Sequence, residues 1–375
     1  MTFRGTLLFG ICSVALTLGC SDDPSPNGGT TTTSGSGGGA QGGGGAAAQG
    51  GGGASQGGAG GGAALPIDGP PDAWAWRPID GTRCANGSTA GVAVNLHEGS
   101  TDFFILVSGG GACWDDAMCN GESPASIHLH EDLTEALITP ELPDVDRSDS
   151  TNPLSVASWV YVPYCTGDLH WGDTQTEYPG GTIQHRGASN MRTFLERLRA
   201  TRPGTGRVLF LGGSAGGYGV SLHWGTAKDV FGDAVEVHAL ADASPLVVPK
   251  DGRWDTMQAA WSPVLPAGCS GCATDPGFLI DALATAYPTS RHGLLVYDAD
   301  SVISTYFGFQ GDLPAAVDAL LAAHHDPFPN TKYFVAAGTD HGVLGDAITA
   351  PDGSTPNSFA VGWLTGNADW HSSHF

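Results

Sequence analysis

The stretch 208–219 constrains the fold more than any other part of the chain. An apolar run, V-L-F-L at 208–211, leads directly into G-G-S-A-G at 212–216, and sequence compatible with a helix follows. A G-x-S-x-G pentapeptide between a strand and a helix is typical of a sharp turn that exposes the serine hydroxyl above the edge of a sheet. Gly212 and Gly216 flank the serine where a Cβ would clash in so tight a turn. In a chain with 58 glycines the pentapeptide alone is weak, but its context indicates that Ser214 is a nucleophile rather than part of a chance turn.

The first 64 residues differ from the rest of the chain in composition. Arg4 precedes an apolar stretch, 7–18, that is too short for a permanent membrane span and runs into Cys20. Residues 1–19 resemble a lipoprotein signal peptide with Cys20 as the lipidated residue, although leucine stands two residues before the cysteine instead of three; an ordinary secretory signal is the alternative. Residues 20–64 are almost entirely Gly, Ser, Thr, Ala and Gln, which predicts a disordered tether. We therefore expect one folded domain, 65–375, exported and held in the cell envelope at the outer membrane or cell surface, or else secreted.

The net charge of −23 limits the partners of this domain. Arg4, Asp22 and Asp23 are the charges before residue 65, so the predicted domain carries −22. Such a surface repels nucleic acid and anionic membranes, which argues against both as partners. Membrane contact is expected only through the lipid at Cys20.

Six cysteines lie in the predicted domain, apart from Cys12 and Cys20 in the N-terminal region. An even number in an exported domain indicates disulfides, and six cysteines allow fifteen pairings that the sequence cannot choose between. Proximity favours Cys113–Cys119 and Cys269–Cys272, which leaves Cys84–Cys165. A metal site at Cys269 and Cys272 would need two further ligands, and the chain has no second C-x-x-C pair.

Apolar runs alternate with amphipathic stretches through the domain. The runs predict strands at 90–96, 102–107, 158–163, 208–211, 235–240, 293–297 and 333–338. Apolar stripes predict helices around 191–198 and 312–323, the second with Asp312 as its cap. This alternation favours an α/β fold with a mostly parallel sheet and crossover helices.

Two segments after predicted strands carry polar chemistry. The glycine run 109–111 lacks the lysine of a phosphate-binding loop, but its backbone N–H groups suit an oxyanion hole; a plain turn is the alternative. The loop after 158–163 contains Asp168, His170 and Asp173, which could be drawn as a metal site. A hydrogen-bonded, disulfide-anchored loop at the rim of a cleft is the favoured interpretation.

A serine needs an imidazole to take its proton, and the imidazole needs a carboxylate to fix its tautomer. Both follow late predicted strands: Asp298 and Asp300 after 293–297, and His341 after 333–338. The chain order Ser214, Asp, His341 is that of α/β-hydrolases. A solvated loop histidine is the alternative for His341, and for His371 and His374 in the polar tail it is the preferred interpretation.

Five motifs in order resemble the pectin acetylesterase/Notum family. They are C-A-N-G-S at 84–88, G-G-G-A-C-W at 109–114, P-Y-C-T-G-D at 163–168, G-G-S-A-G-G at 212–217 and D-H at 340–341. The resemblance implies an α/β-hydrolase fold that cleaves oxygen esters through a Ser-Asp-His triad, with no metal or other cofactor. It assigns Ser214 as nucleophile and His341 as general base, with oxyanion-hole N–H groups at Gly110, Gly111 and Ala215. The sequence after Asp300 resembles the Asp-Ser-aromatic pattern of plant members, which favours Asp300 over Asp298 as the acid.

Two departures from plant members bear on the substrate. Ala112 replaces the tryptophan before Cys113, and Gly342 replaces the cysteine after the histidine. Pectin is a polyanion that a domain at −22 repels unless local arginines intervene. We expect an esterase that removes acyl groups, acetyl in the first instance, from a carbohydrate or similar extracellular substrate. The alternatives are a non-catalytic surface-binding lipoprotein on the same fold and a lipase or fatty-acyl esterase.

Overall fold

The computed structural model describes residues 64–121, 129–149 and 151–375. The predicted signal peptide, Cys20 and the tether up to residue 63 lie outside the described residues.

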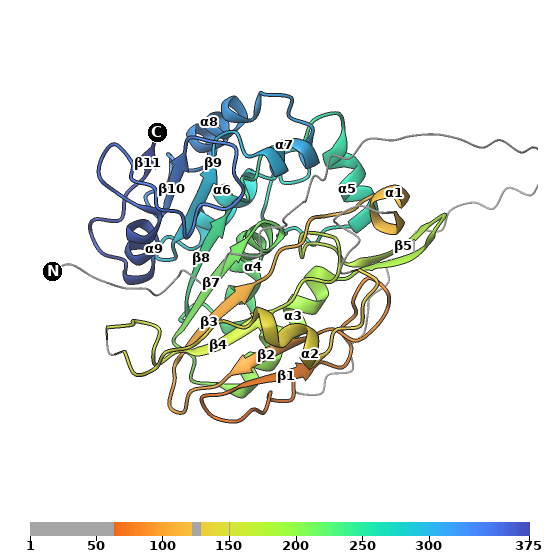
Figure 1. The fold of residues 1–375 in the computed structure, drawn as a ribbon, viewed down its shortest axis with the longest axis vertical. Coiled ribbons are helices and arrows are strands. Elements are labelled where there is room, and N and C mark those ends of the chain that lie inside the picture. Colours follow the sequence, from red (N-terminus) through yellow and green to blue (C-terminus); the bar gives the residue numbers. More distant parts are fainter. Residues whose placement is uncertain (1–63, 122–128, 150) are drawn as a thin grey trace, which may run out of the picture. The chain divides into compact units, whose positions relative to one another are not determined.

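A nine-stranded sheet organises the described residues, in the order β1-β2-β4-β3-β7-β8-β9-β10-β11 (Figure 1). β1 and β2 pair antiparallel, and β2 joins β4 antiparallel, whereas every pair from β4 to β11 is parallel. The strands are β1 (Trp74–Pro78), β2 (Gly91–Asn95), β3 (Asp102–Val107), β4 (Ser158–Val162), β7 (Arg207–Gly213), β8 (Glu236–Asp242), β9 (His292–Tyr297), β10 (Thr331–Ala336) and β11 (Ser373–His374). The predicted mostly parallel sheet is confirmed, and each of the seven predicted strands overlaps a strand of this sheet.

Both faces of the sheet are covered, which explains why its central strands are apolar throughout. In β3, Phe103 and Ile105 face one core while Phe104 and Leu106 face the other, as the two-residue period of a strand requires. The first core includes residues of α3 (Gly187–Thr201), α4 (Ala215–Phe231), α5 (Arg253–Trp261), α6 (Phe278–Ala286), α7 (Ser301–Phe307) and α8 (Leu313–His324). The second includes residues of α2 (Glu135–Ile138) and α9 (Pro356–Thr365). None of the helices in the described ranges is both long and apolar enough to cross a bilayer.

The three disulfides are Cys84–Cys165, Cys113–Cys119 and Cys269–Cys272. These are the pairs favoured by proximity and by elimination, so that prediction is confirmed. The first ties the segment before β2 to the loop after β4, and the second closes a short ring around the start of α1 (Asp116–Asn120).

Several elements do not follow from the apolar pattern. A separate hairpin of β5 (Thr174–Tyr178) and β6 (Gly181–His185) follows the β4 loop. The segment 357–375, expected as a tail, forms most of α9 and all of β11, which pairs with β10. Asp312 precedes α8 as expected, but its side chain makes no capping hydrogen bond.

Candidate active site

Ser214 occupies a strained turn between β7 and α4. Its backbone has φ 54° and ψ −127°, a region that residues other than glycine rarely adopt and that costs on the order of 1–3 kcal/mol. The glycines beside it are required sterically: a Cβ on Gly216 would lie 2.0 Å from the carbonyl oxygen of Val107, and one on Gly212 would lie 2.3 Å from that of Gly216. The turn leaves Ser214 half-buried at the carboxyl end of the parallel strands.

Asp300 and His341 meet after the ends of β9 and β10. The Nδ1 of His341 lies 2.8 Å from Oδ2 of Asp300, which is fully buried, whereas the histidine side chain is 24% exposed. The other oxygen of Asp300 accepts the N–H groups of Val302 and Ile303 and so caps α7. The carboxylate is therefore fixed on one side and presents its remaining oxygen to the imidazole.

Asp298, the second candidate acid, lies elsewhere. Its Oδ1 accepts the backbone N–H of Gly338 at 3.0 Å. The structure thus brings Asp300 to His341 and uses Asp298 to tie the end of β9 to the end of β10.

Asp242, the last residue of β8, joins the serine turn to the histidine loop. Its backbone carbonyl accepts the N–H of Ser214 at 2.8 Å. Its carboxylate accepts the N–H groups of Val343 and Leu344, at 2.8 and 3.0 Å. Burial raises the pKa of Asp242 to about 6, although these two N–H groups and the nearby His341 oppose the rise. The apolar pattern predicts a strand over 235–240 and does not single out Asp242, because the partners of its side chain lie 101 and 102 residues away.

The glycine loop after β3 packs against the serine turn. A Cβ on Gly109 would lie 2.6 Å from the carbonyl oxygen of Gly213, 3.0 Å from Cβ of Ser214 and 3.3 Å from the backbone nitrogen of Ala215. Gly110 and Gly111 follow with φ 154° and 77°, conformations that favour glycine. Ala215 opens α4, so its N–H has no acceptor within the helix. The loop and the helix start therefore lie together beside Ser214, and their role as oxyanion donors stays a prediction.

The loop after β4 is hydrogen-bonded and disulfide-anchored, as expected, but it is buried rather than at a rim. Asp168 accepts the Thr166 hydroxyl and the N–H groups of His170, Gly172 and Gly187. The Nε2 of His170 lies 3.0 Å from the carbonyl oxygen of Ser108. Burial raises the pKa of Asp168 to about 6 and lowers that of His170 to about 4.

Asp173 pairs instead with Arg186, at 2.8 Å, so the three residues drawn as a metal site have separate partners. Across the described residues, the one cluster of three metal-ligand side chains is Cys113, Cys119 and His185, and its two cysteines form a disulfide. A disulfide supplies no thiolate ligand. The exposed His371 and His374 pair with Asp352 and Asp318, at 3.1 and 3.3 Å.

The amino-acid sequence is similar to one protein family and to two curated proteins. The family model described as pectinacetylesterase matches residues 77–271. The palmitoleoyl-protein carboxylesterase Notum of Drosophila melanogaster is 30% identical over 158 residues, which cover 39% of this chain and 23% of the relative. Pectin acetylesterase 7 of Arabidopsis thaliana is 26% identical over 180 residues, covering 46% of this chain and 44% of the relative. The matches thus span less than half of each curated relative.

The similarity to solved structures extends over a larger part of the chain than the similarity in sequence to the curated relatives. Two crystal forms of the Wnt deacylase Notum from Drosophila match 78% of this chain, with TM-scores of 0.57 and 0.59 at 20% and 21% identity. They are covered over 93% and 92% of their own length. At this identity the likeness establishes the arrangement of helices and strands.

Proposed function

The chain belongs to the pectinacetylesterase family. We propose that it is a carboxylic ester hydrolase that cleaves its ester through Ser214, His341 and Asp300. The observation that carries the proposal is the bond of 2.8 Å between Asp300 and the His341 ring, on a loop that Asp242 ties to the Ser214 turn. A carboxylate on Nδ1 holds the tautomer whose Nε2 can accept a proton.

In the proposed mechanism His341 takes the hydroxyl proton as Ser214 attacks the ester carbonyl carbon. The tetrahedral oxyanion accepts hydrogen bonds from the N–H of Ala215 and from the Gly110–Gly111 turn, and the start of α4 favours this negative charge. His341 then gives the proton to the departing alcohol, which leaves an acyl-serine. Water, activated by the same histidine, hydrolyses the acyl-serine and restores the enzyme.

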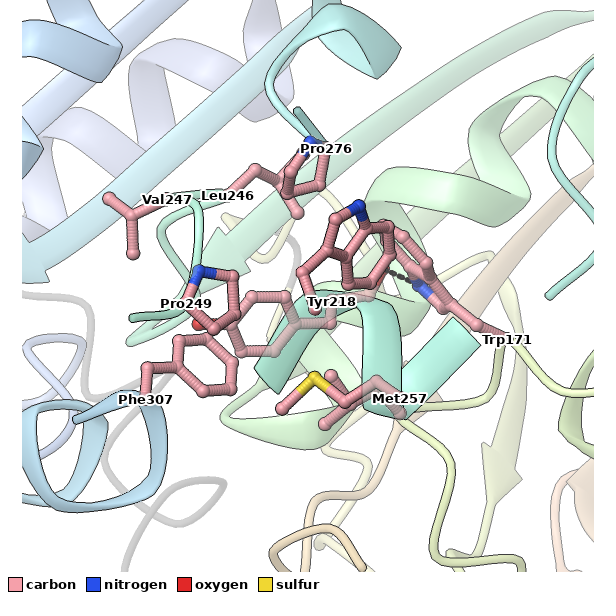
Figure 2. A pocket seen from close by; sticks show the side chains of 10 residues that line it. Trp171, Tyr218, Leu246, Val247, Pro249, Met257, Pro276 and Phe307 are labelled. Carbon is pink, nitrogen blue, oxygen red and sulfur yellow. Dashed lines mark hydrogen bonds between the residues drawn. The ribbon is translucent and has the colours of Figure 1, made fainter. Parts of the chain in front are cut away.

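A small apolar pocket is lined in part by residues of α4 and α7. Because side chains almost fill it, it favours a substrate with a short acyl group such as acetyl. Tyr218 lies one turn after Ser214 on α4, and Phe307 ends α7, the helix that Asp300 caps. Figure 2 shows both rings in the pocket, with Met257 and Trp171. The free space among these side chains is about 10 Å³, no more than one water molecule needs. A long acyl chain would have to displace these side chains.

For the alcohol part of the substrate we propose an acylated carbohydrate or a similar extracellular ester. The charge of −22 on 65–375 disfavours a strongly anionic polymer such as bare pectin. Export and lipidation at Cys20 belong to the same proposal; a Cys20→Ser protein that still partitions into detergent like the native one would contradict the anchor.

The function is tested with nitrophenyl esters from acetate to palmitate. We expect the acetate ester to be cleaved best, with activity falling as the solution becomes acidic, because the general base must be neutral to accept a proton. Ser214→Ala and His341→Ala should each lower kcat by about 10⁴-fold or more, and the double variant should lose little beyond either, because the two side chains act as a unit. Hydrolysis by Ser214→Ala at the native rate would refute the proposed function. Preference for palmitate would refute the short acyl group alone.

A further inference from the structure

A second buried carboxylate lies close to the proposed triad. Asp242 is fully buried, so substrate cannot touch it. Its backbone holds Ser214 and its side chain holds Val343 and Leu344, the residues that follow Gly342. One residue therefore contacts both the segment of the nucleophile and the segment of the base.

We propose that Asp242 is a positioning residue of the esterase, which fixes the Ser214 turn relative to the His341 loop and places a second negative charge near the imidazole. This inference rests on the proposed function. A loop held at two consecutive N–H groups by one carboxylate has little freedom to translate or rotate, and an error of about 1 Å between nucleophile and base can cost about 10²-fold in rate. Gly342, the residue before Val343, has φ 91°, a backbone conformation that favours glycine. A Cβ placed there would lie 3.7 Å from Oδ2 of Asp242, an ordinary contact distance, so the carboxylate lies directly beside the residue that follows His341.

The charges around this carboxylate come from three elements. His341 and Asp346 lie on the loop after β10, and both influence the ionisation of Asp242 in opposite directions. The hydroxyl of Tyr297, at the end of β9, donates a hydrogen bond of 2.7 Å to Asp346. The negative charges of Asp346, Asp340 and Asp242 add to burial in raising the pKa of this hydroxyl. Asp300 is hydrogen-bonded to Nδ1 of the imidazole. Of these groups, His341 lowers the pKa of Asp242 and Asp346 raises it, so Asp242 lies within electrostatic reach of the imidazole.

The test is the Asp242→Asn variant, assayed on the acetate ester from pH 5 to 9. The amide offers one acceptor oxygen, so one of the two N–H groups faces an NH₂ and the loop loses an anchor. We expect kcat to fall by about 10–100-fold with KM within about twofold. The acid limb of kcat/KM should move to lower pH, because a negative charge near the proposed base is removed.

Asp242→Glu separates charge from geometry. It keeps the negative charge but displaces it by one methylene, so the acid limb should stay at its native position while kcat falls. This variant also carries the test if the asparagine protein does not fold. The matched control is Asp168→Asn, which removes an equally buried carboxylate that holds N–H groups of a different loop.

The proposal is overturned if both Asp242 variants keep native kcat, or if Asp242→Asn leaves the acid limb in place. A shift of the acid limb by Asp168→Asn as large as that by Asp242→Asn also overturns it, because the effect would then be general. Failure of the proposed function is read separately, from Ser214→Ala, and these outcomes do not depend on each other.

Discussion

The loop after β4 contains an aspartate and a histidine, and so do the loops after β9 and β10 taken together. The hydrogen bonds of the two Asp and His pairs differ. In the β4 loop, Asp168 accepts three backbone N–H groups, and His170 faces a backbone carbonyl. In the later loops, Asp300 bonds directly to the ring of His341. His170 is 4% exposed, whereas the His341 side chain is 24% exposed.

A nearby Asp and His are therefore a candidate catalytic pair only when the carboxylate is hydrogen-bonded to the ring and the ring is exposed to solvent. A carboxylate whose oxygens are saturated by amides stabilises a loop and leaves no oxygen to orient an imidazole. A fully buried imidazole stays neutral at physiological pH and cannot reach substrate. By these criteria the β4 loop stabilises the fold, and the later loops contain the candidate catalytic pair.

The largest expected effect on activity is that of Asp300→Asn, which tests the role of the later loops. The amide cannot hold the productive tautomer, so kcat should fall by about 10³–10⁴-fold while the helix cap on α7 survives through the remaining oxygen. Steady-state kinetics on the acetate ester measure the loss. Asp298→Asn is the control and should keep kcat within about threefold, because Asp298 bonds Gly338 instead of the ring. A reversed order of the two variants would assign the acid to Asp298.

A smaller effect, on stability, is expected from Asp168→Asn. An amide nitrogen in place of either oxygen leaves buried N–H groups without an acceptor, which costs about 1–3 kcal/mol for each group. We expect the free energy of unfolding to fall by about 3 kcal/mol, measured in urea, with kcat of the folded protein within about threefold. A large loss of kcat at unchanged stability would place this loop in the catalytic machinery and end the contrast.

The smallest effect is the dependence of stability on pH. Burial lowers the pKa of His170 and His185 to about 4 and of His223, His238 and His292 to about 3. In the unfolded chain these residues take up protons below about pH 6.5, so the unfolded state binds more protons and stability falls as the pH drops. Asp168 and Asp242 act in the opposite direction, since their raised pKa values near 6 let the folded state bind protons first.

Burial lowers the pKa of His325 as well, so six histidines oppose the two carboxylates, whereas the raised pKa values of His324 and His371 act with the carboxylates. The net result should be a loss of about 2 kcal/mol or more between pH 7 and pH 5. Urea unfolding at the two pH values, with circular dichroism as the readout, measures it. Equal or greater stability at pH 5 would mean that the histidines are not buried as neutral groups.

The centre of the fold could be predicted from the sequence because burial on both faces makes its strands continuously apolar. The run 102–107 and the run before Ser214 are such cases. The hairpin of β5 and β6 was missed because its sequence, T-Q-T-E-Y and G-T-I-Q-H, is mostly polar, and its side chains bond to one another. β11 has two residues and depends entirely on β10 for its pairing.

The candidate site was predictable where chemistry follows a strand directly, as at Ser214 and His341. The choice between Asp298 and Asp300 needed a resemblance, because both stand in the same short loop and spacing does not distinguish them. Asp242 could not be found from the sequence, since its side chain acts on residues about 100 positions away. Its position at the end of β8, next to β7 in the sheet, was the available signal.

The Cys84–Cys165 disulfide has a consequence for the biogenesis of the protein. Both cysteines precede Ser214 in the chain, and they lie 81 positions apart in the sequence. In a chain-entropy treatment a loop of this length destabilises the unfolded chain by about 4.5 kcal/mol. The N-terminal part of the polypeptide emerges first during synthesis and export. In an oxidising compartment this disulfide can therefore form, and fix the loop of Asp168, before β7 and β8 have emerged. In a host that keeps thiols reduced, the same chain would have to fold without this disulfide. We therefore expect the yield of active protein to depend on the compartment in which the chain is made.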